Sequence, residues 1–231
     1  MRRLVLFDID GTLLLSLGAG RRALVQAMAA ELGDAAAAAA QVRFDGKTDP
    51  QIVQEMFGAA DLPMPSDQQV TAILQHYLAC LEQVLAHPDH RTEIMPGVPG
   101  LLDRIEGEGN VLLGLLTGNV AGGAELKLRS GAIDPQRFRV GAYGSDHAVR
   151  AELPAIAAGR AEPLFGRRPH GQEIVIIGDT PADVTCGLAV GARAIGVATG
   201  AYNTAELARA GAYAVFENLS DQQAVWEAIS A

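Results

Sequence analysis

The stretch Leu4-Val5-Leu6-Phe7-Asp8-Ile9-Asp10-Gly11-Thr12-Leu13 decides the fold that this sequence predicts. The continuous apolar run 4–7 is typical of a strand buried on both faces of a parallel sheet. Asp8 and Asp10 follow at the carboxyl end of this strand, where open α/β sheets bind their ligands. Two carboxylates so close together raise each other's pKa, and a divalent cation is the simplest compensation. The stretch therefore predicts an α/β protein with a metal-dependent site beside its first strand.

Two motifs that mimic other binding loops fail on their spacing. An EF-hand that began at Asp8 would need Gly at its sixth position and Glu at its twelfth, but Gly11 comes fourth and Ala19 comes twelfth. Gly46-Lys47-Thr48 resembles the end of an ATP-binding P-loop, but Gln41 stands where that motif needs its first Gly. Calcium-loop and P-loop functions are therefore excluded.

A second apolar run, 111–116, predicts another buried strand, and Thr117-Gly118-Asn119 follows at its carboxyl end. The next helix is expected to begin near Ala121. The free N–H groups and the positive dipole end of that helix would then face the same sheet edge. This arrangement predicts a cradle for a phosphate group.

A third run, 173–178, ends at Gly178 and is followed by Asp179. Thr180 and Pro181 predict a helix N-terminus, with Asp183 in the first turn. Because the carboxyl ends of parallel strands meet at one edge, we expect Asp179 to face Asp8.

These motifs together resemble the haloacid dehalogenase-like (HAD-like) superfamily, within its phosphatase branch. The run 8–13 resembles the first motif, and 16–20 is similar to phosphoglycolate-phosphatase-type members. Thr117 and Asn119 fit the second motif, and 178–183 resembles the fourth motif, Gly-Asp-x-x-x-Asp. The resemblance implies an α/β fold, namely a modified Rossmann core with an inserted α-helical cap and a bound Mg²⁺.

The helical patterning predicts two domains. Residues 1–15 and 96–231 would form the HAD-like Rossmann core, and the mostly helical segment 16–95 would form the cap. Within the cap, the irregular loop 44–50 is expected to face the active site, with Asp49 capping the next helix and Pro50 at its first position. Lys47 on this loop is a candidate to recognise a substrate carboxylate or sugar hydroxyl.

The resemblance also implies a role for each motif residue. Asp8 would be the nucleophile and Asp10 the general acid and base. Mg²⁺ would be held by Asp8, the backbone carbonyl of Asp10, Asp179 and Asp183. The phosphoryl group would be bound by Gly11, Thr12, Thr117, Gly118 and Asn119. The family's third motif supplies a cation, but this sequence has Arg150-Ala151-Glu152 instead of Lys-Pro in the expected place. Lys127, on the earlier helix, is preferred to Arg150 as the source of this cation, and the alternative for either residue is a solvated surface charge.

The function predicted from the resemblance is a Mg²⁺-dependent phosphatase that hydrolyses a small phosphomonoester such as phosphoglycolate through an aspartyl-phosphate. Asp10 argues against a dehalogenase, which lacks this second acid. A β-phosphoglucomutase-like mutase remains an alternative because it shares Asp8 and Asp10. A phosphonate hydrolase that uses Lys47, and a binding module without activity, are weaker alternatives.

Composition restricts the partners. The 231-residue chain is 49% hydrophobic, enough for a substantial core, and its net charge of −9 without a Lys/Arg run argues against nucleic acid. Only a short apolar run follows Met1-Arg2-Arg3, and no run approaches ~18 apolar residues. We therefore expect a cytoplasmic protein without membrane contact, which acts on a small phosphorylated metabolite as a monomer or homodimer.

Overall fold

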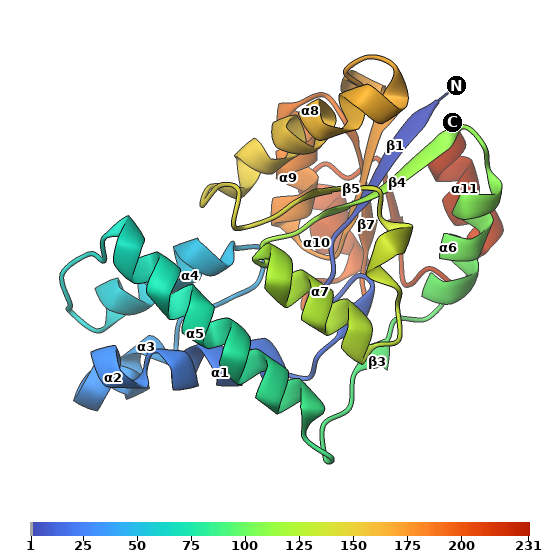
Figure 1. Ribbon diagram of the computed structural model, residues 1–231. Helices are drawn as coiled ribbons and strands as arrows, with labels where there is room; N and C mark the ends of the chain where they lie inside the picture. Colours follow the sequence, from blue (N-terminus) through green and yellow to red (C-terminus); the bar gives the residue numbers. More distant parts are fainter. Residues whose placement is uncertain (1) are drawn as a thin grey trace.

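The computed structural model describes residues 2–231, and its centre is a parallel sheet (Figure 1). Across these residues the sheet has six strands in the order β5-β4-β1-β6-β7-β8. The strands are β1 (Arg3–Phe7), β4 (Val111–Leu116), β5 (Val140–Ala142), β6 (Ile174–Gly178), β7 (Arg193–Val197) and β8 (Ala214–Phe216). All five residues of β1 are buried, and β1 pairs with β4 on one side and β6 on the other. The predicted α/β fold with a parallel sheet is confirmed.

Helices cover both faces of this sheet, as an apolar run buried on two faces requires. On one face, side chains of β1, β4 and β6 pack against α6 (Val98–Gly107), α7 (Ala121–Ser130) and α11 (Gln222–Ser230). On the other face, the strands pack against α8 (Leu153–Phe165) and α9 (Pro181–Ala189). The remaining core elements are η2 (Pro135–Arg137), η3 (Arg150–Glu152), η4 (Gly171–Glu173) and α10 (Thr204–Arg209).

Residues between β1 and β4 form a helical body beside the carboxyl edge of the sheet (Figure 1). This body consists of α1 (Ala19–Ala27), α2 (Ala29–Leu32), η1 (Gly33–Ala35), α3 (Ala36–Ala39), α4 (Asp49–Ala59) and α5 (Asp67–Ala86). It has a hydrophobic cluster of its own, in which Met56, Tyr77 and Leu81 are fully or nearly fully buried. The body matches the segment predicted as a cap, and the exact domain boundaries stay a prediction.

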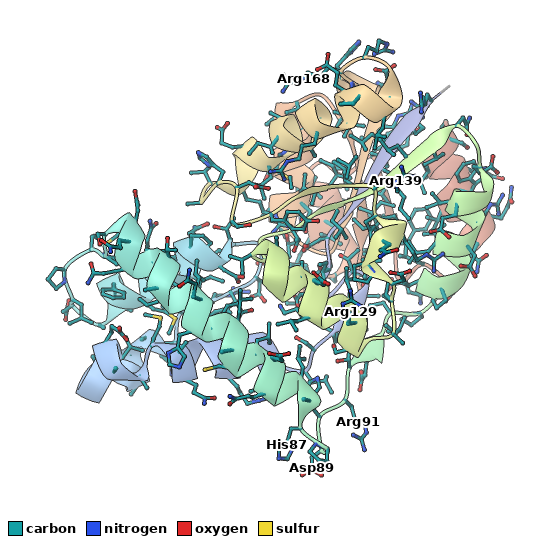
Figure 2. The ribbon with its side chains drawn as sticks, viewed as in Figure 1. His87, Asp89, Arg91, Arg129, Arg139 and Arg168 are labelled. Atoms are coloured by element: carbon teal, nitrogen blue, oxygen red, sulfur yellow. The ribbon has the colours of Figure 1, made fainter. Side chains whose placement is uncertain are left out.

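Two short strands join the helical body to the core. β2 (Leu14–Leu15) and β3 (Glu93–Ile94) pair antiparallel, so the chain leaves and re-enters the core at one place. Figure 2 shows His87, Asp89 and Arg91 in the connection between α5 and β3, at the bottom of the view. No helix within residues 2–231 is long and apolar enough to cross a membrane.

Two of the helix starts follow directly from local sequence. Ser66 and Gln69 form a reciprocal capping box at the start of α5, as their spacing predicts. Thr180 and Asp183 form the same motif at the start of α9, with Pro181 in the first turn. The second box brings Asp183 back toward the end of β6.

Candidate active site

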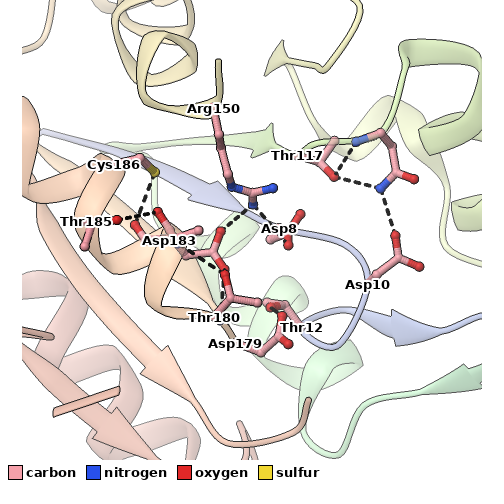
Figure 3. A network of polar contacts seen from close by, with 12 residues as sticks. Asp8, Asp10, Thr12, Thr117, Arg150, Asp179, Thr180, Asp183, Thr185 and Cys186 are labelled. Carbon is pink, nitrogen blue, oxygen red and sulfur yellow. Dashed lines mark hydrogen bonds and ion pairs between the residues drawn. The ribbon is translucent and has the colours of Figure 1, made fainter. Parts of the chain in front are cut away.

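The ends of β1 and β6 bring three buried carboxylates together. Oxygens of Asp8, Asp179 and Asp183 all lie within 4.8 Å of one another (Figure 3). Asp8 is fixed by its own N–H, which donates to the carbonyl of Ile177 at 2.9 Å. The Thr12 hydroxyl donates to Asp179 Oδ1 at 3.0 Å, so it orients an acid of this cluster. The expected meeting of Asp8 and Asp179 is therefore present.

Two glycines give Asp179 its space. A Cβ on Gly11 would lie 2.3 Å from Asp179 Oδ2, and a Cβ on Gly200 would lie 1.8 Å from the same oxygen. Gly11 also has φ +83°, a left-handed conformation that other residues rarely adopt. The turn after β1 therefore needs Gly11 for its backbone conformation and for the approach of the carboxylate.

The surroundings of the acid cluster disfavour the ionised forms of Asp8 and Asp179. Burial raises the pKa of Asp8 to about 6, with Arg150 opposing the rise and Asp183 adding to it. Burial also raises the pKa of Asp179 well above its ordinary value, and the charges of Asp183 and Asp8 raise it further. Oxygen ligands of this kind suit a hard divalent cation, which would stabilise the ionised forms. The residues present therefore fit Mg²⁺.

The side chain of Arg150, which lies in the short helix η3, points into the acid cluster between Asp8 and Asp183 (Figure 3). Its Nη2 lies 3.1 Å from Asp8 Oδ2 and also pairs with Asp183. Burial alone would lower the pKa of Arg150, but the two carboxylates raise it, so the guanidinium stays charged. Nε of Arg150 is buried without a hydrogen-bond partner among the described residues.

Asp10 lies in a separate network on the other side of Asp8. Lys127 Nζ donates to Asp10 Oδ2 and to Asn119 Oδ1, each at 2.6 Å. Asn119 Nδ2 donates to Asp10 Oδ2 and to Thr117 Oγ1, each at 2.8 Å. Ser16 Oγ donates to Asp10 Oδ1 at 3.3 Å. The two candidate cations therefore serve different acids: Arg150 contacts Asp8, and Lys127 contacts Asp10.

This network determines the charge of Asp10. Burial alone would raise its pKa, but Lys127, Asn119 and Ser16 together hold the pKa below its ordinary value. The Asp10 side chain is also 40% exposed, whereas Lys127 is 6% exposed. Asp10 is therefore an ionised carboxylate that faces solvent and can exchange protons with it.

The amino end of α7 is not the open phosphate cradle that the sequence suggests. The N–H of Val120 donates to Asp49 Oδ2 at 2.8 Å, and the N–H of Ala121 donates to Ser145 Oγ at 3.2 Å. The expectation of free N–H groups is wrong at these two positions, because side chains from distant segments already accept both. Gly118, two residues before Val120, lines the cavity described next.

A cavity of about 260 Å³ joins the sheet edge to the helical body. Asp8, Asp10 and Arg150 line its core side, and Arg21, Phe44 and Lys47 line its other side. Lys47 pairs with Glu55, and Arg21 stacks on Phe44 with its guanidinium 4.1 Å from the ring centroid. The volume suits a ligand of small-metabolite size.

The loop 44–50 does face the site, but Asp49 has a different role from the one expected. Thr48 is the N-cap of α4, where its hydroxyl accepts the N–H of Gln51 at 3.3 Å, and Asp49 is the first helical residue. The prediction that Asp49 caps this helix is wrong, because its carboxylate accepts from Val120 instead. Asp49 and Ser16 were not predicted as site residues. The Asp-Pro pair marked Asp49 only as a helix start.

Comparisons with known proteins agree with this fold. A family model described as HAD-hydrolase-like matches residues 150–222. The phosphoglycolate phosphatase of Rhodospirillum rubrum is 28% identical over 221 residues, which cover 95% of this chain and 89% of that protein.

Solved structures match the chain over nearly its whole length. A hydrolase from Pseudomonas syringae has a TM-score of 0.72 and 20% identity, and the match covers 98% of each chain. CbbY from Rhodobacter sphaeroides, in complex with phosphate, has a TM-score of 0.71 and 17% identity, and the match covers 96% of each chain. The chain is therefore similar to HAD-like hydrolases over residues 150–222 and to a phosphoglycolate phosphatase over nearly its whole length, and it shares the fold of these solved structures.

Proposed function

We propose that this protein is a Mg²⁺-dependent phosphatase that hydrolyses a small phosphomonoester through an aspartyl-phosphate. The observation that carries the proposal is that two carboxylates at one cavity, Asp8 and Asp10, lie in different surroundings. Asp8 lies in a buried cluster with Asp179 and Asp183, whereas the side chain of Asp10, two residues on, is 40% exposed and bonds to other partners. A nucleophile and a proton carrier with different environments are what phosphoryl transfer through a covalent intermediate needs.

Asp8 supplies the nucleophilic oxygen. Its pKa of about 6 leaves the carboxylate mostly ionised at pH 7.5, and Arg150 stabilises that charge. The oxygen of Asp8 bonds to phosphorus as the bond to the ester oxygen breaks, and the alcohol leaves with a proton from Asp10. Water then attacks phosphorus and gives its proton to Asp10, the bond to Asp8 breaks, and inorganic phosphate is released.

Asp10 must carry a proton in the first step and accept one in the second. In the free protein Lys127 and Asn119 hold its pKa low, which suits the base. The role as acid requires these two donors to turn toward phosphoryl oxygens when the substrate binds, because their loss raises the pKa of Asp10. Thr117, which donates no hydrogen bond to a described acid, is placed to join them.

Mg²⁺, when bound, would neutralise charge on the phosphoryl oxygens and on Asp8. We assign its ligands to carboxylates of Asp8, Asp179 and Asp183 and to the backbone carbonyl of Asp10. Thr12 supports this set through its bond to Asp179.

The substrate class follows from the size of the cavity and from the relative's name. A cavity of about 260 Å³ with Lys47 on its far side suits a short phosphomonoester with a second polar group. Phosphoglycolate is the first candidate, since a full-length relative is named for it. A cytoplasmic location, a monomer or homodimer, and the lack of a nucleic-acid or membrane partner all remain predictions.

Lys47 gives little support to a phosphonate hydrolase. Its Nζ forms an ion pair with Glu55 of the helical body rather than with an acid of the core. A mutase would share Asp8 and Asp10, and differs in returning the phosphoryl group to a sugar instead of water.

The test is phosphate release from an aryl phosphate, with Mg²⁺ and with chelator, by wild type and Asp8→Asn. Mg²⁺-dependent release that disappears in Asp8→Asn supports the proposal, and a panel that begins with phosphoglycolate then ranks substrates. Conversion of a sugar phosphate to its isomer without phosphate release would favour the mutase. Release that survives in purified Asp8→Asn would contradict the nucleophile.

A further inference from the structure

Asp49 makes two hydrogen bonds from the helical body to the loop that follows β4. Its carboxylate Oδ2 accepts the N–H of Val120 at 2.8 Å, and its own N–H donates to the carbonyl of Gly118 at 2.8 Å. The Asp49 side chain is buried against this loop. One residue of the cap segment therefore holds both sides of Asn119.

The sequence of α7 explains why this contact matters. Val120 is the N-cap residue of α7, but it has no side-chain acceptor for the first N–H groups of the helix. Asp49 instead accepts the N–H of Val120 itself, which is the N–H that the third residue of a capping box would accept. Its negative charge also suits the positive end of the helix dipole. The Val120 side chain meanwhile packs in the hydrophobic cluster of the helical body. The cap segment thus contributes one of the two side-chain acceptors at the start of α7, and Ser145 contributes the other.

The neighbours of Asp49 fix the same contact. Thr48 Oγ1 donates to the carbonyl of Ala148 at 2.6 Å. A Cβ on Gly118 would lie 1.9 Å from the carbonyl oxygen of Lys47, so the two backbones meet without room for a side chain. The segment 47–49 therefore lies directly on the loop 117–120.

The loop and α7 carry the groups that the proposed phosphatase mechanism needs. Asn119 lies between the two hydrogen bonds of Asp49, and Lys127 lies about two turns further along α7. Both donate to Asp10. A shift of this loop would change the distance from both donors to the phosphoryl group.

We propose, on the basis of the phosphatase function above, that Asp49 is a positioning residue: its two hydrogen bonds fix the loop 117–120 and the start of α7 when the cap segment is closed on the core. Asp49 acts through Asn119 and Lys127 and forms no bond to the substrate. The contact makes the phosphoryl-binding geometry depend on cap closure.

The experiment compares Asp49→Ala, Asp49→Asn and Asp61→Asn with wild type. Asp61 is an exposed aspartate of the same helical body, outside the site, so Asp61→Asn is the matched control for the loss of one charge. One readout is kcat and KM for Mg²⁺-dependent aryl phosphate hydrolysis. The other is amide hydrogen exchange in a peptide that covers 117–124.

We expect Asp49→Ala to lower kcat by about tenfold or more, because a lost buried acceptor leaves the Val120 N–H unpaired. Asp49 forms no bond to the substrate in this proposal, so KM should change much less. Exchange in 117–124 should become about tenfold faster or more, since opening of the contact is the step that exposes these amides. Asp49→Asn keeps an oxygen acceptor and should recover part of both losses, and Asp61→Asn should match wild type.

Unchanged exchange in 117–124 of Asp49→Ala, or a kcat equal to that of wild type, would overturn the positioning role. Should Asp49→Ala fail to fold, Asp49→Asn decides by the same two readouts, with a smaller but measurable loss expected. An inactive wild type would contradict the phosphatase function, and the exchange measurement would then still test the contact by itself.

Discussion

Mg²⁺ binding should raise the thermal stability of this protein, and Asp179→Asn should remove most of that gain. Oxygens of Asp8, Asp179 and Asp183 lie within 4.8 Å of one another. Burial raises the pKa of Asp8 to about 6 and that of Asp179 well above its ordinary value, so the folded protein disfavours these charges. A cation stabilises them only in the folded state, because the unfolded chain does not bring the three residues together.

The size of the effect follows from mass action. A ligand that binds only the folded state, at about 100 times its Kd, adds about 2.7 kcal/mol to the free energy of unfolding. Each kcal/mol shifts Tm by about 2–4 °C in a domain of this size, so we expect a rise of about 5–11 °C. If Asp179→Asn weakens Mg²⁺ binding about 100-fold, the same concentration leaves about 0.4 kcal/mol, or about 1–2 °C.

Differential scanning calorimetry of wild type and Asp179→Asn, with MgCl₂ and with chelator, measures this difference. Asp61→Asn on the exposed surface of the helical body serves as the control and should keep the full rise. With chelator, Asp179→Asn should be at least as stable as wild type near pH 7.5, because it removes a carboxyl group whose ionisation is opposed by burial and by the charges of Asp183 and Asp8. An equal Mg²⁺-dependent rise in wild type and Asp179→Asn would refute the assignment, as would the absence of any rise in wild type.

Three further predictions concern single side chains. Arg150→Ala and Lys127→Ala should each lower kcat on the order of 10²-fold or more, because each removes a cation that contacts a reacting acid; steady-state kinetics that match wild type would exclude the residue concerned. Lys47→Ala should raise KM for the true substrate more than for an aryl phosphate, and equal effects on the two substrates would exclude recognition by Lys47. Burial raises the pKa of the Asp49 carboxyl to about 6, above the ordinary 3.8, so the folded state binds the carboxyl proton more tightly than the unfolded state. The free energy of unfolding should therefore increase as pH falls from about 7 to about 4. Asp49→Asn should lack this contribution of about 3 kcal/mol, at about 1.4 kcal/mol for each pKa unit; urea unfolding of both proteins at several pH values measures it, and parallel pH curves would contradict it.

The sequence predicted the sheet and its acidic edge because the responsible signals are local. The run 4–7 is buried on both faces of the sheet, as its continuous apolar character required. Parallel strands then brought Asp179 to Asp8, although the two residues are far apart in the sequence. Thr180 and Asp183 cap α9 as their spacing indicates. Each of these features depends on a few adjacent residues and one topological rule.

The pairing of acids with cations could not be predicted in the same way. Lys127 and Arg150 both lie near the acids, and only the path of the chain in space decides that Lys127 contacts Asp10 and Arg150 contacts Asp8. Asp49 and Val120 are 71 residues apart, and no pattern in either segment marks the contact. Local rules predicted that Asp49 would cap its own helix, but Thr48 was the better placed acceptor.

The pairing of β2 with β3 has a consequence for how such a protein can evolve. Leu14 pairs with Ile94 and Leu15 with Glu93, so the two ends of the helical segment are already joined where they meet the core. Closing a long insertion between fixed ends costs little more entropy than closing a short one. The segment can therefore be lengthened, shortened or exchanged by recombination without disturbing the strand ends that carry Asp8 and Asp179. Under the proposed function, selection would then change substrate preference in one part of the gene while the reaction chemistry in the other part is inherited intact.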